Sequence, residues 1–216
     1  SYLLTSVGIS TVPVISNFAV PPPVSGVQCQ MKFSPNGRKL FCGNHTDYSP
    51  GTTAVFELYD FDPSTGIVSN RIPLLTPPST CGYALGAGTE FSPDGSKIYG
   101  SLYQSIPNSE TALIQWNLCA GASSAAIIAS SVVIVPGPFP SLQLAINGKI
   151  YFIFPNNTQG WLGIINNPNA AGTGCNLSFA GVPAPINGVP GAALPNFVKS
   201  MSKPLLAPFS YTANNS

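Results

Sequence analysis

Hydrophobic and polar positions alternate in short stretches along most of this chain, and the apolar runs are separated by clusters of Gly, Pro, Asn and Asp. Alternation with a period of two is typical of half-buried β-strands, and the Gly and Pro clusters are typical of turns. Three segments repeat one order of strand, tight turn and second strand. They are MKFSPNGRKLFCGN at 31–44, TEFSPDGSKIYGSLY at 89–103 and LQLAINGKIYFIF at 142–154.

The turn in each repeat has its own local chemistry. An Asn or Asp that tolerates the left-handed region stands before a Gly that takes a positive φ. The three turn glycines, Gly37, Gly95 and Gly148, lie 58 and 53 residues apart. We therefore expect each repeat to begin with a β-hairpin.

A second pair of apolar runs follows each hairpin. The pairs are 53–62 with 67–75, 111–118 with 125–136, and 160–168 with 176–185. Four short strands every 50 to 60 residues, without helical periodicity, are typical of β-propeller blades. We predict an all-β chain of β-propeller-type four-stranded antiparallel blades, about three blades plus a partial N-terminal one, in an incomplete ring.

The repeat boundaries divide the chain into five segments. These are 1–26 as an N-terminal partial blade, 27–80, 81–138 and 139–198 as blades, and 199–216 as a C-terminal extension. A closed ring needs roughly four to eight blades. Three arrangements stay open: a piece of a larger propeller, assembly with copies of itself, or an open arc whose strand edges are covered by neighbours.

Composition excludes several partners. Charged residues make up 7% of the 216 residues and the net charge is +1, which argues against nucleic acid and anionic membranes. The most apolar stretch, 120–137, contains Ser and Pro and is no block of about 20 apolar residues, so we expect no membrane span. No cofactor motif occurs. A weakly charged, aromatic-rich surface instead favours lasting contact with neighbours.

Five cysteines and a single histidine occur without any C-x-x-C spacing, so no zinc site is predicted. If Phe33 pairs with Arg38 across the first turn, Cys29 meets Cys42. Directly opposed residues on neighbouring strands are close enough for a disulfide. Cys29 and Cys42 are therefore a disulfide candidate, and the alternative is two buried thiols.

Candidate catalytic and metal sites are sparse, and we expect none of either. All seven carboxylates precede residue 111, and His45 is the one histidine available as a base. The acidic segment Asp60–Gly66 could hold calcium, but it lacks the carboxylate that completes an EF-hand loop. The alternative is a turn in which Asp62 bonds forward to the backbone of Ser64 or Thr65.

Two further sets of side chains could carry a modification or a ligand. Sequons make four asparagines candidates for glycosylation: Asn44, Asn156, Asn176 and Asn214. Exposed aromatic side chains could stack on sugar rings, and the candidates are Trp116, Trp161 and Tyr151. The alternative for a large aromatic such as Trp116 is packing between neighbouring blades.

Several motifs resemble the propeller repeats of large Bacteroidetes cell-surface proteins, those with a gliding-motility-associated type 9 secretion sorting domain. The motifs are FSPDGSKIYGS, YDFDPSTGIVSN, LGIINNPNAAGTGCNLSF and LPNFVKS, within residues 27–201. The resemblance implies a secreted propeller module at the cell exterior, without an established catalytic site. This sequence departs from the pattern in its low charge and its small number of blades.

These observations favour a non-catalytic, extracellular structural or adhesive module of a cell-surface assembly such as a filament, sheath or layer. Its expected partners are copies of itself or other segments of a larger surface protein. The alternative is a module that binds a glycan or polymer. A lactonase-like propeller enzyme ranks last, because it needs carboxylates or histidines clustered at a channel mouth.

Overall fold

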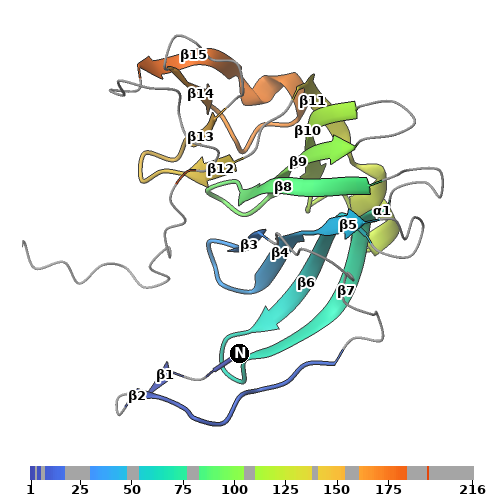
Figure 1. Ribbon diagram of the computed structural model, residues 1–216, viewed down its shortest axis with the longest axis vertical. Coiled ribbons are helices and arrows are strands. Elements are labelled where there is room, and N and C mark those ends of the chain that lie inside the picture. Colours follow the sequence, from blue (N-terminus) through green and yellow to red (C-terminus); the bar gives the residue numbers. More distant parts are fainter. Residues whose placement is uncertain are drawn as a thin grey trace, which may run out of the picture.

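The computed structural model describes residues 1–2, 4–5, 8–17, 30–47, 54–76, 83–104, 110–137, 141–153, 161–183 and 194. Three antiparallel sheets follow one another in chain order (Figure 1). The first sheet has the order β3 (Gln30–Phe33), β4 (Lys39–Gly43), β6 (Phe56–Asp62) and β7 (Ile67–Leu75). The second has β8 (Tyr83–Phe91), β9 (Lys97–Gln104), β10 (Glu110–Asn117) and β11 (Val132–Pro136). The third has β12 (Ser141–Leu144), β13 (Ile150–Ile153), β14 (Trp161–Ile165) and β15 (Leu177–Pro183).

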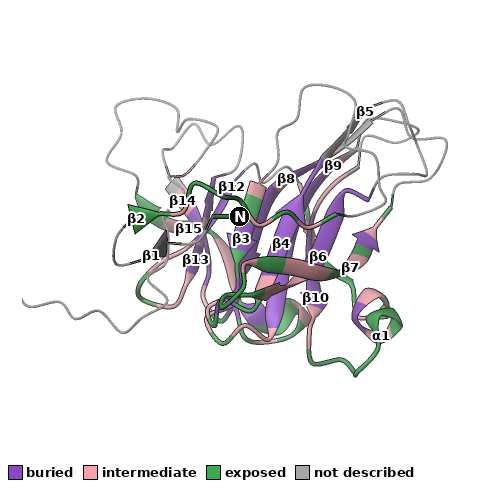
Figure 2. Ribbon diagram, turned by 90° about the horizontal axis from the view of Figure 1, so that it is seen from below, coloured by how far each residue is buried: buried purple, intermediate pink, exposed green. Residues whose placement is uncertain are grey.

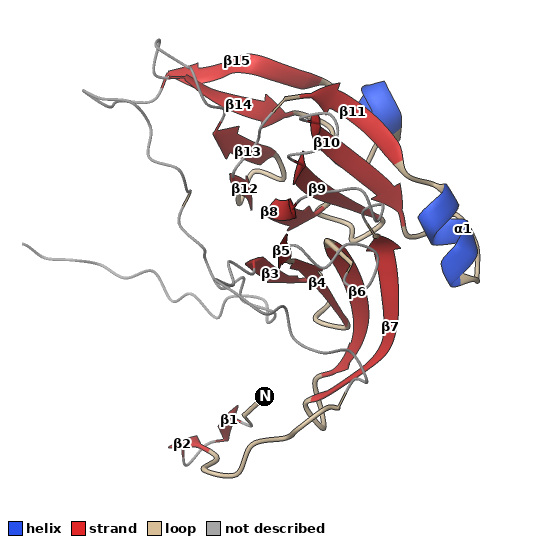
Figure 3. Cartoon of the chain, turned by 45° about the vertical axis from the view of Figure 1, so that its right-hand side comes forward, coloured by secondary structure: helices blue, strands red, loops and turns tan. Residues whose placement is uncertain are grey.

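The three sheets are stacked like the blades of a propeller. Figures 1 and 3 show β3, β8 and β12 on one side of the molecule, and β7 and β11 on the opposite side. The strands β3 and β12 both contact β8, so the first strands of the three sheets lie side by side. The predicted fold class, all-β with β-propeller-type four-stranded antiparallel blades, is confirmed. Each four-stranded meander lies within one of the segments 27–80, 81–138 and 139–198.

Aromatic side chains fill the space between the first and second sheets. Phe41 and Phe56 from the first sheet meet Phe91 and Trp116 from the second, and all four are fully buried. The ring centroids of Phe56 and Trp116 are 5.4 Å apart at an edge-on angle, an arrangement that aromatic pairs prefer. Figure 2 shows the result: β4 is coloured as buried along almost its whole length.

A second buried cluster joins the second and third sheets. Its members are Tyr99, Leu113, Leu142, Ile150, Phe152, Ile165 and Cys175. Phe152 lies opposite Gly163 on the neighbouring strand, and the ring occupies the place where a side chain at Gly163 would stand. The two clusters hold the blades together through burial of apolar area, at roughly 25 cal/mol per Å².

One expectation about the elements was wrong, and one element was not expected. Residues 125–136 do not form one strand, because α1 (Ser124–Ala129) precedes β11 (Figure 3). The side chain of Ser123 accepts a hydrogen bond from the Ala126 N–H and caps this helix, and Ile127 is buried in the first cluster. The short strand β5 (His45–Asp47) was also not expected: it leaves the first sheet and pairs with β8 at the edge of the second.

The register of the first hairpin differs by two residues from the one expected. Phe33 lies opposite Leu40, and Cys42 lies opposite Met31. The main-chain N–H of Ser34 donates to the carbonyl of Lys39 over 3.0 Å, so the loop has four residues, 35–38. The register that placed Cys29 opposite Cys42 is therefore wrong, and Cys29 itself lies outside the described residues.

Smaller elements complete the described chain. A two-stranded sheet is formed by β1 (Leu4–Thr5) and β2 (Gly8–Ile9), and the 3-10 helix η1 (Gly172–Cys175) lies between β14 and β15. Within the described part of the chain, no helix is long and apolar enough to cross a membrane. The segment 199–216 lies outside the described residues.

We expect Gly163→Ala to destabilise the protein by about 1–3 kcal/mol, the usual cost of overpacking a core. The added Cβ would lie 2.1 Å from a ring carbon of the fully buried Phe152. The control is Gly174→Ala, whose Cβ would stand 3.5 Å from the nearest atom. Urea unfolding of both variants measures the difference. Equal stability of the two variants would contradict the tight packing of Phe152 against β14.

Candidate functional site

One position of the repeat brings polar side chains from all three blades together. The residue five places before each turn glycine is Lys32, Glu90 or Gln143. These residues lie on β3, β8 and β12, the three first strands. Because these strands lie side by side and the position is equivalent in each, the three side chains meet where the blades converge. We call them the axial polar cluster.

The contacts within the axial polar cluster are direct. The ammonium group of Lys32 donates a hydrogen bond of 2.8 Å to Oε1 of Gln143. The same nitrogen lies 3.6 Å from Oε2 of Glu90. The Glu90 carboxylate also accepts hydrogen bonds from the main-chain N–H groups of Phe91, over 2.9 Å, and Leu144, over 2.8 Å.

The three members of the cluster differ in how far they are buried. Glu90 is fully buried, whereas Lys32 and Gln143 each retain 7% of their surface. Removing two opposite charges from water costs several kcal/mol per ion, and replacing such a pair with apolar residues is often neutral or stabilising. A contribution to stability alone therefore does not explain a charged pair in this position. Ionisable groups gathered where several elements converge are typical of functional sites.

The cluster can recognise a ligand through oxygen acceptors. An ammonium group offers up to three donors, and the amide of Gln143 offers both a donor and an acceptor. The charges of Lys32 and Glu90 balance each other, so the cluster as a whole is neutral. Within the described residues, no group of three or more His, Cys, Asp or Glu side chains stands close enough to hold a metal ion.

A hydrogen-bonded latch fixes the third blade against the second. The Gln115 amide donates 2.6 Å to the hydroxyl of Tyr99 and 2.8 Å to the carbonyl of Ala170, and it accepts from the Gly172 N–H. The Tyr99 hydroxyl in turn donates to the carbonyl of Pro168. Burial raises the pKa of Tyr99, so this hydroxyl stays protonated. The latch therefore holds the connection between β14 and β15 against the second blade.

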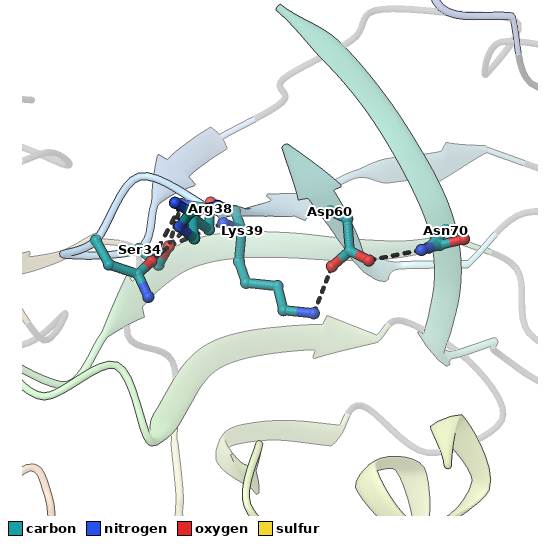
Figure 4. Close-up of polar contacts among 6 residues, drawn as sticks. Ser34, Arg38, Lys39, Asp60 and Asn70 are labelled. Atoms are coloured by element: carbon teal, nitrogen blue, oxygen red, sulfur yellow. Dashed lines mark hydrogen bonds and ion pairs between the residues drawn. The ribbon is translucent and has the colours of Figure 1, made fainter. Parts of the chain in front are cut away.

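A second polar network holds the hairpin that carries Lys32 (Figure 4). The Lys39 ammonium pairs with Asp60, and the Asn70 side chain donates to the other oxygen of that carboxylate over 2.6 Å. Partial burial alone would raise the pKa of Asp60, but these hydrogen bonds and the Lys39 charge together lower it. The Ser34 hydroxyl accepts from the main-chain N–H groups of Arg38 and Lys39. The turn is thereby fixed from both sides.

The segment considered for calcium forms the alternative turn. Oδ1 of Asp62 accepts hydrogen bonds from the N–H and the hydroxyl of Ser64, and Oδ2 accepts from the Thr65 hydroxyl. The bonds from Ser64, followed by the one from Thr65, lower the pKa of Asp62 to about 2. Both oxygens of this carboxylate are therefore engaged by the turn.

The aromatic candidates do not gather at one exposed face. Trp116 is fully buried between the first and second blades, so its assignment as a ligand-facing residue is wrong and the packing alternative holds. Tyr151 is half-buried on β13, and its hydroxyl accepts a hydrogen bond from Asn147. Trp161 begins β14, but its side chain lies outside the described residues, as does that of His45 on β5.

The folded structure also bears on the glycosylation candidates. Asn44 is 9% exposed, and its amide donates to the carbonyl of Ala54 and to the Glu57 carboxylate. A glycan would replace one of the two hydrogens on that nitrogen and so remove one of these bonds, and the folded structure therefore disfavours modification of Asn44. Asn176 is exposed in a left-handed conformation after η1. Asn156 and Asn214 lie outside the described residues.

Sequence reasoning missed the axial polar cluster, although its signal was present. Aligning the three repeats on their glycines places Lys32, Glu90 and Gln143 in one column. A column that is polar in all three copies and is followed each time by an apolar residue of the same strand marks side chains that meet.

Comparisons with known proteins yield distant structural matches. No protein-family model and no curated protein sequence matches the chain. A solved protein from Lactobacillus plantarum is 17% identical, with a TM-score of 0.49 over 85% of this chain and 48% of that one. The periplasmic gluconolactonase of Pseudomonas aeruginosa is 15% identical, with a TM-score of 0.40 over 72% of this chain and 44% of that one. This chain thus spans less than half the length of either protein.

These matches contradict the function that the sequence analysis placed first. One of the matched proteins is a gluconolactonase, which falls in the class of lactonase-like propellers that was ranked last, and not an adhesive or structural module. At this identity and TM-score the likeness does not carry that activity over to this chain. The resemblance to Bacteroidetes surface repeats and the extracellular location stay predictions, because neither is tested by these matches.

We expect Lys32→Met to destabilise the protein by about 3–5 kcal/mol, because it leaves the fully buried Glu90 carboxylate without its cation. Adding Glu90→Gln should recover part of this loss, since the amide is neutral and its oxygen still accepts a main-chain hydrogen bond. The control is Lys39→Met, whose ion pair with Asp60 is about one third exposed. That change should cost no more than about 1 kcal/mol.

Urea unfolding of the four proteins measures this order of stability. A double variant less stable than Lys32→Met alone would contradict the role of Glu90 as a buried anion that depends on Lys32.

Proposed function

We propose that this chain is part of a propeller that binds a small neutral molecule rich in oxygen, of the carbohydrate class, at the axial polar cluster. The observation that carries the proposal is the hydrogen bond from the Lys32 ammonium to the amide oxygen of Gln143 beside the buried Glu90. In this bond a cation at the point where the three blades converge has a neutral oxygen as its partner, and a ligand hydroxyl or carbonyl would offer the same kind of oxygen.

Charge balance supports a neutral ligand over an anion. Glu90 already neutralises Lys32 at 3.6 Å. A second anion on Lys32 would lie near the Glu90 carboxylate in a poorly screened interior, where like charges repel strongly. A hydroxyl or carbonyl oxygen takes a hydrogen bond from the ammonium without this repulsion. Sugars and their lactones offer several such oxygens on one small frame.

Position supports binding over catalysis as the role of the cluster. Lys32 and Gln143 retain some exposure, whereas Glu90 is fully buried, with main-chain donors on both carboxylate oxygens. Glu90 therefore orients Lys32 and does not itself reach a ligand. Ligand sites with a few convergent polar groups in an otherwise apolar setting follow this plan.

The test is a titration of the chain with three probes that share one carbon skeleton: glucose, glucono-δ-lactone and gluconate. We expect glucose and the lactone to bind and gluconate to bind at least about tenfold more weakly, because its carboxylate faces Glu90. Isothermal titration calorimetry measures the affinities, and loss of the lactone above its spontaneous rate is followed in parallel.

The variant Lys32→Met/Glu90→Gln should lose binding, and Lys39→Met should keep it, since Lys39 pairs with Asp60 outside the cluster. Unchanged binding in the double variant, or tighter binding of gluconate than of glucose, would overturn the proposal. Accelerated loss of the lactone would show that the site performs chemistry as well as binding.

A further inference from the structure

We infer that the side chain of Gln143 occupies the ligand's place on Lys32 in the unliganded protein and swings aside when the ligand binds. This inference rests on the proposed function, because it concerns the same cluster. The amide oxygen of Gln143 is a neutral acceptor 2.8 Å from the Lys32 ammonium, which is the contact expected of a sugar hydroxyl or a lactone carbonyl. The protein would thus carry an internal substitute for its ligand.

The contacts of the cluster members separate a fixed part from a movable part. Glu90 is anchored by main-chain N–H groups of two different strands, β8 and β12, and is fully buried. Moving Glu90 would remove the bonds of two main-chain donors, one buried and one partly buried. The Gln143 amide makes its second bond, from Nε2, to the carbonyl of its own neighbour Leu144 over 2.9 Å. That bond is local, so water or a rotated side chain can replace it.

The strand pattern also favours movement of Gln143. Leu142 points into the buried cluster between the second and third blades, together with Phe152 on the neighbouring strand. Successive side chains on a strand point to opposite faces, so Gln143 leaves β12 on the other face, with the half-buried Tyr151 opposite. Its side chain therefore reaches Lys32 without being part of that apolar cluster.

The consequence is a lower apparent affinity for the ligand. A protein whose binding-competent state is a fraction of the population shows a dissociation constant raised by the inverse of that fraction. If Gln143 covers Lys32 in about nine molecules out of ten, removing its amide should tighten binding about tenfold. A variant that covers Lys32 more strongly should weaken binding by a similar factor.

Two substitutions at this position test the inference. We expect Gln143→Ala to bind glucose about tenfold more tightly than the unchanged chain, because the internal competitor is gone. We expect Gln143→Glu to bind it more tightly as well, because the Glu90 carboxylate repels a second carboxylate beside Lys32 and so disfavours the conformation that covers the ammonium. Gln30→Ala on β3 is the control and should leave the affinity unchanged. Thermal unfolding of each variant checks that it folds.

A spectroscopic signal reports the movement itself. The side-chain NH₂ resonances of Gln143, assigned by their loss in Gln143→Ala, should shift on addition of glucose and exchange faster with water. Weaker binding by Gln143→Ala than by the unchanged chain would make Gln143 a direct ligand contact and overturn the inference, while the proposed function would stand. Absence of glucose binding by both the unchanged chain and Gln143→Ala would overturn the two proposals together.

Discussion

The carboxylate of Glu90 joins all three blades at one point. It sits on the second blade, faces the ammonium of Lys32 from the first, and accepts the main-chain N–H of Leu144 from the third. A fully buried anion is tolerated when opposite charge and hydrogen-bond donors surround it, so the three first strands must stay close for Glu90 to remain charged. The position of the three first strands and the charge of Glu90 therefore depend on each other.

The two interfaces between blades meet this constraint in different ways. Between the first and second blades, Phe41, Phe56 and Trp116 form an aromatic contact that needs no polar group at its centre. Between the second and third blades, the apolar cluster is supplemented by the Gln115 latch, which binds the connection after β14. The latch uses Tyr99 on β9 and Gln115 on β10, whereas Glu90 of the axial polar cluster lies on β8, the neighbour of β9. Together they hold the third blade against the second at two separate places.

The local parts of this structure were predictable from the sequence, and the parts that depend on distant contacts were not. Turn glycines act within a few residues, so the hairpins and most strands could be placed. The register of the first hairpin depends on bonds of the Ser34 side chain to Lys39, which the turn motif alone does not specify. Helix α1 forms because Ser123 caps it and Ile127 reaches the first buried cluster, although its sequence continues into a β-rich run.

Function was harder to predict, because the amino-acid composition describes the chain as a whole, whereas a functional site depends on where a few polar residues lie. The low charge content indicated a surface suited to assembly. With eight basic and seven acidic side chains in the whole chain, however, the location of each charge matters more than their number. Lys32 and Glu90 lie buried at the axis, where replacement of such a pair by apolar residues is often neutral or stabilising.

Stability and ligand binding are coupled in this arrangement but do not oppose each other. The anchor of the cluster, Glu90, is held by backbone donors that a ligand need not disturb. The group that a ligand displaces, Gln143, contributes one bond to Lys32 and one local bond to Leu144. A ligand oxygen that replaces the amide oxygen keeps Lys32 satisfied, so the blades stay joined in both states. Lys32 can therefore exchange the amide of Gln143 for a ligand oxygen while the contacts of Glu90 continue to hold the blades together.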